Sequence, residues 1–434
     1  MTAVPDLRRP DALWAHMRHT LAFYAPRVMD PSGGCFQFFK DDGTVYDRRT
    51  RHLVSSTRFV FNHALAWRWF GGPTSDVAHA LAFVNAAHAQ PQGGYAWVLD
   101  WHEGRATVTD GTNHCYGLAF VLLANAHAAE AGVPGAREGI AAAFELMERR
   151  FWEPAHSLYA DEATPDWQIG PYRGQNANMH ACEAMLAAHA ATGEARYLDR
   201  ALTLATSIAQ RQASLAGGLV WEHYRTDWTP DWDYNRDDKT NIFRPWGFQT
   251  GHLTEWAKLL LMLERRLSEA APEWLVPTAR HFFDAAMQRG WDAKHGGLVY
   301  GFAPDESWSP PPAGTQSPPP GGHAGLGSGP ATDMKVCDGD KYFWVQAESL
   351  AAAAWLAVRT GDASYWQWYD RLWAYAWQHF VDHEHGAWYR ILGPDNAKLT
   401  DEKSPAGKTD YHTMGACQDV LAALGIQPPP KATA

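Results

Sequence analysis

A short motif recurs six times along this chain: a turn of small residues followed at once by aromatic or apolar residues. The first copy is Gly33-Gly34-Cys35-Phe36. The other copies are Gly93-Gly94-Tyr95-Ala96, His156-Ser157-Leu158-Tyr159, Gly217-Gly218-Leu219-Val220, Gly296-Gly297-Leu298-Val299 and Gly386-Ala387-Trp388-Tyr389. Repetition of one motif along a chain indicates one structural unit used several times, rather than several unrelated domains.

The segments between these motifs carry helical periodicity. Apolar residues recur there at spacings of three and four, which is typical of amphipathic or fully buried helices. The clearest examples are Asn113–Ala131, Met179–Ala191, His252–Leu267 and Val345–Val358. Gly193 and Gly361 each follow such a run, where a C-cap glycine ends a helix. The apolar pieces Leu219–Tyr224 and Trp388–Leu392 are predicted to be short strands of hairpins at one end.

Two helices in each of six repeats give about twelve helices. A helix pair cannot bury its apolar face alone, and six pairs that close into a ring bury every such face. The sequence therefore predicts an all-α fold, a single (α/α)6-barrel domain over residues 1–434, with hairpins at one rim that form the site. An open solenoid of six pairs is the alternative. Residues 308–333, rich in Pro and Gly, are expected to form a surface loop in the fifth repeat.

The composition narrows the class of partner. The chain has 37 Lys and Arg against 48 Asp and Glu, a formal charge of -11, which argues against nucleic acid or an anionic membrane as a partner. It also has 22 Trp. A polar cleft floored with indole rings is a common way to hold sugars, although indoles that simply pack between helices are the alternative. The Trp content alone is therefore compatible with a small-molecule sugar as the partner and equally with packing between helices.

No targeting or membrane-spanning segment is expected. The first twenty residues contain no continuous apolar stretch of the secretory type, and the apolar run that begins at Tyr116 is too short to cross a bilayer. Five widely spaced Cys without a C-x-x-C pair do not fit a disulfide scaffold or a cysteine zinc site. These features predict a cytoplasmic protein; whether it is a monomer or a homodimer stays open.

Ionisable residues interrupt the apolar helices near their predicted starts. His180 with Glu183 and His252 with Glu255 are spaced i, i+3, so each pair shares one helix face. Glu348, His412 and Arg58 stand near the starts of three other helices. If the ring closes, equivalent positions in successive repeats point toward one axis, and these side chains meet at one rim.

Other functions fit parts of this pattern. The two His/Glu pairs imitate, in reversed order, the metal-ligand pairs of di-iron bundles. Glu255 and Glu348 offer the two carboxylates that a glycoside hydrolase needs, and a non-catalytic sugar-binding protein is a third alternative. The motifs of P-loops, dinucleotide-binding folds and serine hydrolases are missing from the sequence.

Four segments of the sequence resemble those of a known superfamily. They are Tyr172–His180 (YRGQNANMH), Phe243–His252 (FRPWGFQTGH), Asp340–Glu348 (DKYFWVQAE) and Lys408–His412 (KTDYH). They resemble the N-acylglucosamine 2-epimerase superfamily, and within it the bacterial D-mannose isomerase branch. The resemblance spans essentially the whole chain, and the superfamily fold is an (α/α)6 barrel.

The resemblance implies a sugar isomerase of the aldose–ketose type that interconverts D-mannose and D-fructose, and also D-lyxose and D-xylulose, through a cis-enediol, without a cofactor or metal. His252 and His412 match the acid/base pair of the superfamily. The positions that match its sugar contacts are Arg58, Tyr116, Asn176, His180, Glu255 and Glu348; Arg244 lies within one of the matching segments, and Phe343 with Trp344 forms a flat surface for the sugar.

The proposed chemistry assigns a task to each group. Histidine titrates near neutral pH, so we expect His412 to be the base at C2 and C1, and His252 to assist ring opening and move the hydroxyl proton, although these roles can be exchanged. Glu255 and Glu348 are expected to orient the imidazoles, and Arg58 with His180 to stabilise the oxyanion.

Two positions depart from the superfamily pattern. Phe343 stands where a Trp is frequent, and Leu118 stands where the branch has a His. Both departures concern sugar preference rather than the chemistry. Sugar 2-epimerisation stays the alternative reaction, because it also begins with deprotonation of C2.

Overall fold

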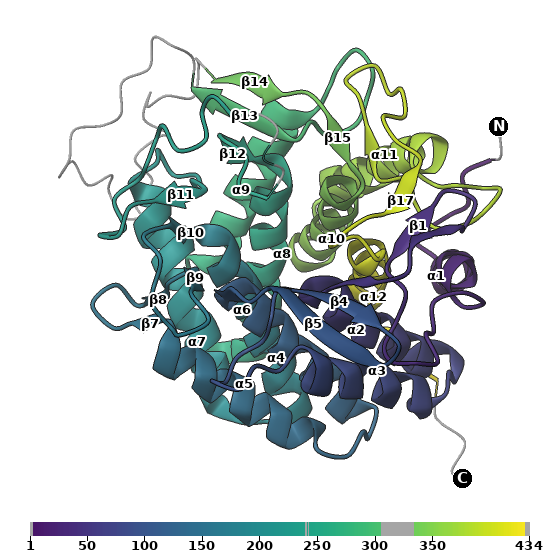
Figure 1. Ribbon diagram of the computed structural model, residues 1–434. Helices are drawn as coiled ribbons and strands as arrows, with labels where there is room; N and C mark the ends of the chain where they lie inside the picture. Colours follow the sequence, from purple (N-terminus) through teal and green to yellow (C-terminus); the bar gives the residue numbers. More distant parts are fainter. Residues whose placement is uncertain (1–2, 239–240, 242, 305–333, 430–434) are drawn as a thin grey trace.

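The computed structural model describes residues 3–238, 241, 243–304 and 334–429. The expected loop at 308–333 lies outside these residues. The described part contains twelve α-helices and seventeen short strands (Figure 1). None of its helices combines the length and the apolar character that a membrane crossing requires.

Six helices form an inner ring. They are α2 (Leu53–Phe70), α4 (Cys115–Glu130), α6 (Gln175–Thr192), α8 (Thr250–Leu267), α10 (Phe343–Thr360) and α12 (Tyr411–Ala423). Each packs against the next, and α12 returns to α2, so the C-terminal helices in yellow lie beside the N-terminal ones in purple (Figure 1). The ring is closed, and the predicted (α/α)6 barrel is confirmed.

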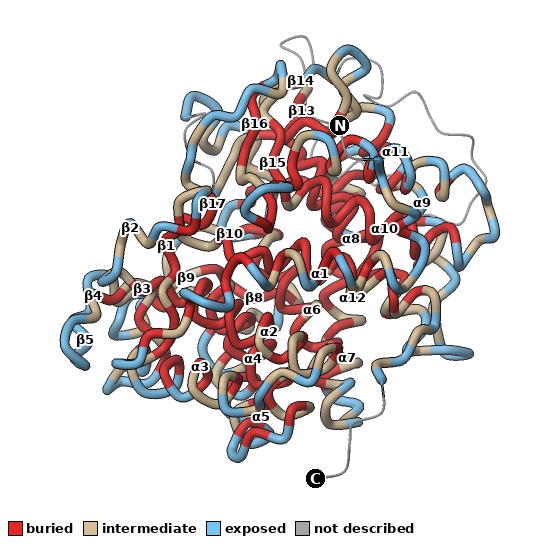
Figure 2. The backbone as a smooth tube through the Cα atoms, turned by 90° about the vertical axis from the view of Figure 1, so that its right-hand side faces the viewer, coloured by how far each residue is buried: buried red, intermediate tan, exposed pale blue. Residues whose placement is uncertain are grey.

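The other six helices surround this ring. They are α1 (Pro10–Tyr24), α3 (Thr74–Ala87), α5 (Ala136–Arg150), α7 (Ala195–Ala205), α9 (Leu275–Gly290) and α11 (Ala363–His379). Two short elements extend helices: the π-helix η1 (Thr206–Gln212) follows α7, and the 3-10 helix η2 (Ser268–Ala270) follows α8. Figure 2 shows buried residues gathered on the inner helices and exposed stretches at the periphery. This explains why α4 is apolar almost throughout, whereas α5 has one apolar stripe.

Antiparallel strand pairs form the rim at the N-terminal ends of the inner helices. Each strand before an inner helix pairs with a strand after the next outer helix around the ring, which for α12 is α1 at the start of the chain. The pairs are β3 (Thr50–His52) with β4 (Val98–His102), β6 (Asn113–His114) with β9 (Glu162–Ala163), β10 (Arg173–Gly174) with β11 (His223–Tyr224), β12 (Phe248–Gln249) with β13 (Gly301–Pro304), β15 (Lys341–Tyr342) with β16 (Ile391–Leu392), and β17 (Glu402–Ser404) with β1 (Phe38–Lys40). The remaining strands are β2 (Val45–Asp47), β5 (Arg105–Asp110), β7 (Trp152–Glu153), β8 (Leu158–Tyr159) and β14 (Met334–Asp338).

The recurring sequence motif is the turn that joins an outer helix to this rim. Asn113 Oδ1 accepts a hydrogen bond from the Tyr95 backbone N–H at 3.2 Å, and Gln346 Oε1 accepts one from the Leu298 N–H at 3.0 Å. Gly94 has a φ of 88°, and a Cβ added there would lie 2.1 Å from Asn113 Oδ1. The motif at Gly94 therefore needs its small residue both for the backbone conformation and for close contact with Asn113 in the rim strand before the next inner helix.

The predicted element boundaries differ from the observed ones. The apolar run Met179–Ala191 lies within α6, whose polar first turn, starting at Gln175, carries no apolar stripe. Arg58 does not stand at a helix start: α2 begins at Leu53, which places Arg58 in its second turn. Of the two predicted strands, only the last two residues of each form β11 and β16.

Candidate active site

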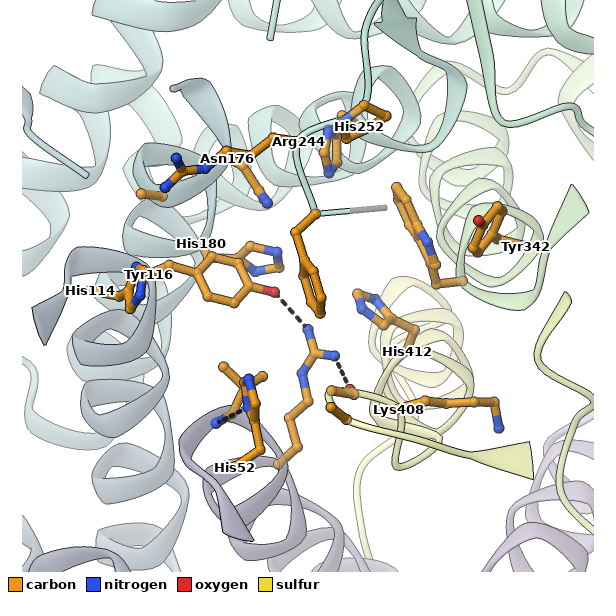
Figure 3. Close-up of a pocket in the computed structure, with 18 of the residues that line it drawn as sticks. His52, His114, Tyr116, Asn176, His180, Arg244, His252, Tyr342, Lys408 and His412 are labelled. Atoms are coloured by element: carbon orange, nitrogen blue, oxygen red, sulfur yellow. Dashed lines mark hydrogen bonds between the residues drawn. The ribbon is translucent and has the colours of Figure 1, made fainter. Parts of the chain in front are cut away.

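A cavity of about 300 Å³ opens at the rim, where the first turns of all six inner helices meet (Figure 3). Ten of the side chains predicted from the sequence line it: Arg58, Tyr116, Asn176, His180, Arg244, His252, Glu255, Phe343, Trp344 and His412. Glu348 does not line the cavity but lies behind His412. Closure of the ring thus brings the predicted residues together.

His412 is held by a carboxylate. It is the second residue of α12, and its Nδ1 lies 2.7 Å from Glu348 Oε1 on α10. An ionised carboxylate only accepts hydrogen bonds, so Nδ1 carries the proton and Nε2 keeps its lone pair. Burial, aided by the charge of Arg58, lowers the pKa of His412 to about 4 although Glu348 opposes this. The imidazole is therefore neutral at neutral pH and available as a base.

His252 is held in the same way by a residue that the sequence did not single out. Its Nδ1 lies 2.9 Å from Glu222 Oε2, and Gln175 Nε2 donates to the same oxygen at 3.0 Å. The expectation that Glu255 orients His252 is wrong. Glu255 lies one turn further along α8 and faces His180, with Oε1 3.7 Å from His180 Nδ1.

Trp344 lies against both imidazoles. Its ring centroid is 5.0 Å from that of His252 and 5.7 Å from that of His412, with interplanar angles of 36° and 38°. Gly251 makes room for it, because a Cβ there would lie 2.3 Å from the indole. The two candidate acid/base groups therefore flank one flat apolar surface.

Glu255 is the least satisfied polar group of the site. Its side chain is 1% exposed, and neither oxygen has a hydrogen-bond partner among the described residues. Burial, with the charges of Glu348 and Glu183 nearby, raises its pKa well above the usual range. Burial therefore favours the protonated form of Glu255, which can donate a hydrogen bond to an oxygen in the cavity.

Arg58 is a buried cation fixed by neutral groups. Its guanidinium donates to the Gly407 carbonyl and, at 3.1 Å, to the Tyr116 hydroxyl (Figure 3). It also lies between the rings of Phe120 and Tyr411, at 4.5 and 4.7 Å. In the described chain no carboxylate lies within 4.0 Å of it, so its charge is available to a negative oxygen in the cavity.

Asn176 and Arg244, both predicted to contact the sugar, differ in whether their polar atoms already have partners. Asn176 Oδ1 is buried and has no partner in the described structure, so this amide is ready to bind a ligand. Arg244 is already paired: its guanidinium donates to Glu162 Oε2 at 2.5 Å and lies over the Tyr172 ring. Arg244 therefore shapes the wall of the cavity more than it offers an unoccupied charge.

The sequence did not identify several residues of the wall, because all but Val54 and Ala177 come from rim strands and loops. They are His52, Val54, Trp97, His114, Asp161, Tyr172, Ala177, Phe243, Pro245, Tyr300, Tyr342, Arg390, Ala406, Gly407 and Lys408. Of the tryptophans in the described residues, only Trp97 and Trp344 line the cavity, so most of the Trp content serves packing.

Two groups of three side chains could hold a metal ion, and they share Glu255. The first is His180, Glu183 and Glu255; the second is Glu255, Glu348 and His412. In both, the histidine Nδ1 already faces a carboxylate, at 2.9 Å for His180 and Glu183. A metal would have to replace these protons, and His252 belongs to neither group, unlike in the pairing expected from the sequence.

Comparison with known proteins identifies the family. Residues 34–310 and 322–416 match the family described as N-acylglucosamine 2-epimerase (GlcNAc 2-epimerase). This chain belongs to that family.

Relatives within the family cover nearly the whole chain. A D-mannose isomerase of Marinomonas mediterranea is 51% identical over 418 residues, which are 95% of this chain and 97% of that protein. A D-mannose isomerase of Thermobifida fusca is 37% identical over 93% of this chain and 92% of its own length.

Solved structures agree with this assignment. A crystal structure of a D-mannose isomerase matches this family member with a TM-score of 0.87 and 49% identity, over 97% of this chain and all of the other. Cellobiose 2-epimerase from Spirochaeta thermophila matches with a TM-score of 0.78 at 20% identity, over 97% and 98% of the two chains, which supports the fold alone.

Proposed function

We propose that this protein is an aldose–ketose isomerase that interconverts D-mannose and D-fructose. The observation that carries the proposal is the pair of imidazoles, each backed by its own carboxylate and both facing one cavity across Trp344. The relatives named D-mannose isomerase favour isomerisation over 2-epimerisation. The same chemistry extends to D-lyxose and D-xylulose, which differ from these sugars beyond the reacting carbons.

The reaction moves two protons. In the opened sugar, His412 Nε2 removes the C2 proton, and the electron pair of the broken C–H bond forms the C1–C2 double bond of a cis-enediolate with its charge on O1. His252 takes the proton of the O2 hydroxyl and gives it to O1. The imidazolium of His412 then returns its proton to C1, and the C2 carbonyl of the ketose forms.

The remaining groups bind and stabilise. Arg58 supplies positive charge to the enediolate oxygen, with His180 beside it, and the protonated form of Glu255, which burial favours, donates a hydrogen bond to the sugar. Trp344 and Phe343 offer apolar surface to the sugar ring. A glycoside hydrolase mechanism lacks its second carboxylate, because Glu348 is engaged with His412 outside the cavity wall.

Proton NMR of the protein with D-mannose in D2O and EDTA tests this function. We expect fructose to appear, with any deuterium uptake at its C1. Glucose without fructose would replace the isomerase by a 2-epimerase. An unchanged spectrum would contradict free D-mannose as the substrate, and activity that disappears with EDTA and returns with a divalent metal would support the metal alternative.

Glu222 provides a test of the geometry around His252. Glu222→Gln keeps the shape of the side chain but removes the negative charge that fixes the imidazole tautomer, so we expect kcat to fall about 10- to 100-fold with KM within about threefold. Glu148→Gln on the outer helix α5, which removes the partner of Arg200, is the matched control and keeps kcat. Equal rates for Glu222→Gln and the wild type would remove Glu222 from the mechanism.

A further inference from the structure

A buried lysine lies behind the base of the proposed reaction. Lys258 is on α8, two turns beyond His252, and its side chain is 3% exposed. Its Nζ donates to Glu348 Oε2 on α10 at 2.6 Å and forms an ion pair with Asp419 Oδ2 on α12 at 2.9 Å. Lys258 on α8 is thus joined to two other inner helices, α10 and α12.

Lys258 has no access to the sugar. It does not line the 300 Å³ cavity. Together with Glu348 and Asp419 it lines a second cavity, of about 140 Å³. Any effect of Lys258 on the reaction must therefore pass through the residues that it contacts.

Glu348 passes on that effect, because its two oxygens have different partners. Oε1 accepts from His412 Nδ1 at 2.7 Å, and Oε2 accepts from Lys258 at 2.6 Å. A carboxylate that is 3% exposed prefers to be neutral unless a cation compensates it. Burial favours a higher pKa for Glu348, and Lys258 with His412 reverses this into a net lowering.

The other charged groups around this pair do not replace Lys258. The groups that act on Lys258 are Asp419, Glu348, Glu183 and Glu255, and those that lower the pKa of Glu348 are Lys258 and His412. Glu183 is engaged with His180 and Tyr411. Lys258 is therefore the buried ammonium that compensates Glu348.

We propose that Lys258 is a positioning residue that keeps Glu348 ionised and aligned, and thereby keeps His412 in the tautomer with a free Nε2. If Glu348 took up a proton, it would donate to Nδ1, and the imidazole proton would sit on Nε2, where it blocks removal of the C2 proton. The inference rests on the proposed function of His412 as base.

Lys258→Met tests the proposal through the pH profile of kcat. Without the ammonium, Glu348 becomes protonated at higher pH, so we expect the acid limb of the profile to move up by about one unit or more. At a pH below both limbs kcat falls about tenfold for each unit by which the limb moves, recovers as the pH rises, and KM changes less than about threefold. Lys258→Arg keeps the charge and restores the wild-type profile.

A matched control separates this effect from the loss of any buried lysine. Lys403 forms a buried ion pair with Asp382 and lines neither cavity, so Lys403→Met keeps the wild-type pH profile. If Lys258→Met does not fold, Lys258→Gln takes its place. A Lys258→Met or Lys258→Gln enzyme with the wild-type acid limb would overturn the proposal.

Nitrogen NMR of the imidazole gives a reading that does not depend on turnover. The signal of His412 is assigned by its absence in His412→Asn. We expect the Nδ1–H form in the wild type and a shift toward Nε2–H in Lys258→Met. If the wild type does not convert D-mannose, the proposed function fails, and an unchanged tautomer in Lys258→Met separately refutes the role of Lys258.

Discussion

His412→Asn is expected to lower kcat for the conversion of D-mannose about 10³- to 10⁴-fold, toward the upper end of what a general acid–base group contributes. Asparagine fills much of the space of the imidazole but cannot take up the C2 proton. Because Arg58, Asn176 and Glu255 still surround the sugar, we expect its Kd to change less than about threefold. Single-turnover kinetics and titration calorimetry measure the two quantities separately.

Two further variants make this result specific. His281→Asn changes a histidine on the outer helix α9 that contacts the Gly218 carbonyl, and it keeps the wild-type rate. His252→Asn retains slow exchange of the C2 proton with solvent, because His412 is intact. If His412→Asn instead keeps this exchange and His252→Asn loses it, the two histidines have the opposite roles.

The sequence contained most of the fold. The six turn motifs and the helical periods predicted the pairs of helices, because each pattern reports local geometry. Closure could not be derived in this way, since the contact between α12 and α2 joins residues far apart in the sequence. The apolar run Met179–Ala191 covers only part of α6, because the first turn of this helix is polar and places Asn176 in the cavity wall.

Most site residues on the inner helices were predicted from the sequence, whereas those on the rim strands and loops were mostly missed. Glu222 stands at the end of the segment that leads into β11, and pairing of β11 with β10 places it beside His252, thirty residues away along the chain. The i, i+3 spacing pointed instead to Glu255, but that side chain faces α6. A carboxylate buried among aromatic residues directly after a repeat motif was the available signal.

Lys258 shows the same limit within one helix. It follows His252 and Glu255 at intervals of three residues, so its place on the inner face of α8 was visible in the sequence. The ion pairs of Lys258 were not visible in the sequence, because its partners Glu348 and Asp419 come from two other helices. Which carboxylate serves which cation is decided by tertiary packing.

Arg58→Gln is expected to lower kcat about 10²- to 10³-fold, the effect of removing one charged donor from a developing oxyanion. The charge of Arg58 is not neutralised by a nearby carboxylate in the described structure, and its position is fixed by Gly407, Tyr116 and two aromatic rings. The group is therefore already in place when negative charge forms on O1, and little reorganisation is needed.

Arg58→Lys distinguishes charge from geometry in this prediction. The ammonium keeps the positive charge but cannot donate to Gly407 and Tyr116 in the fixed fork of a guanidinium, so it loses its alignment and restores only part of the rate. Arg200→Gln, which removes a guanidinium paired with Glu148 at the outer layer, keeps kcat and controls for the substitution itself. If Arg58→Gln raised KM while kcat stayed constant, Arg58 would bind the sugar equally in the ground and transition states, and the enediolate would need another source of positive charge.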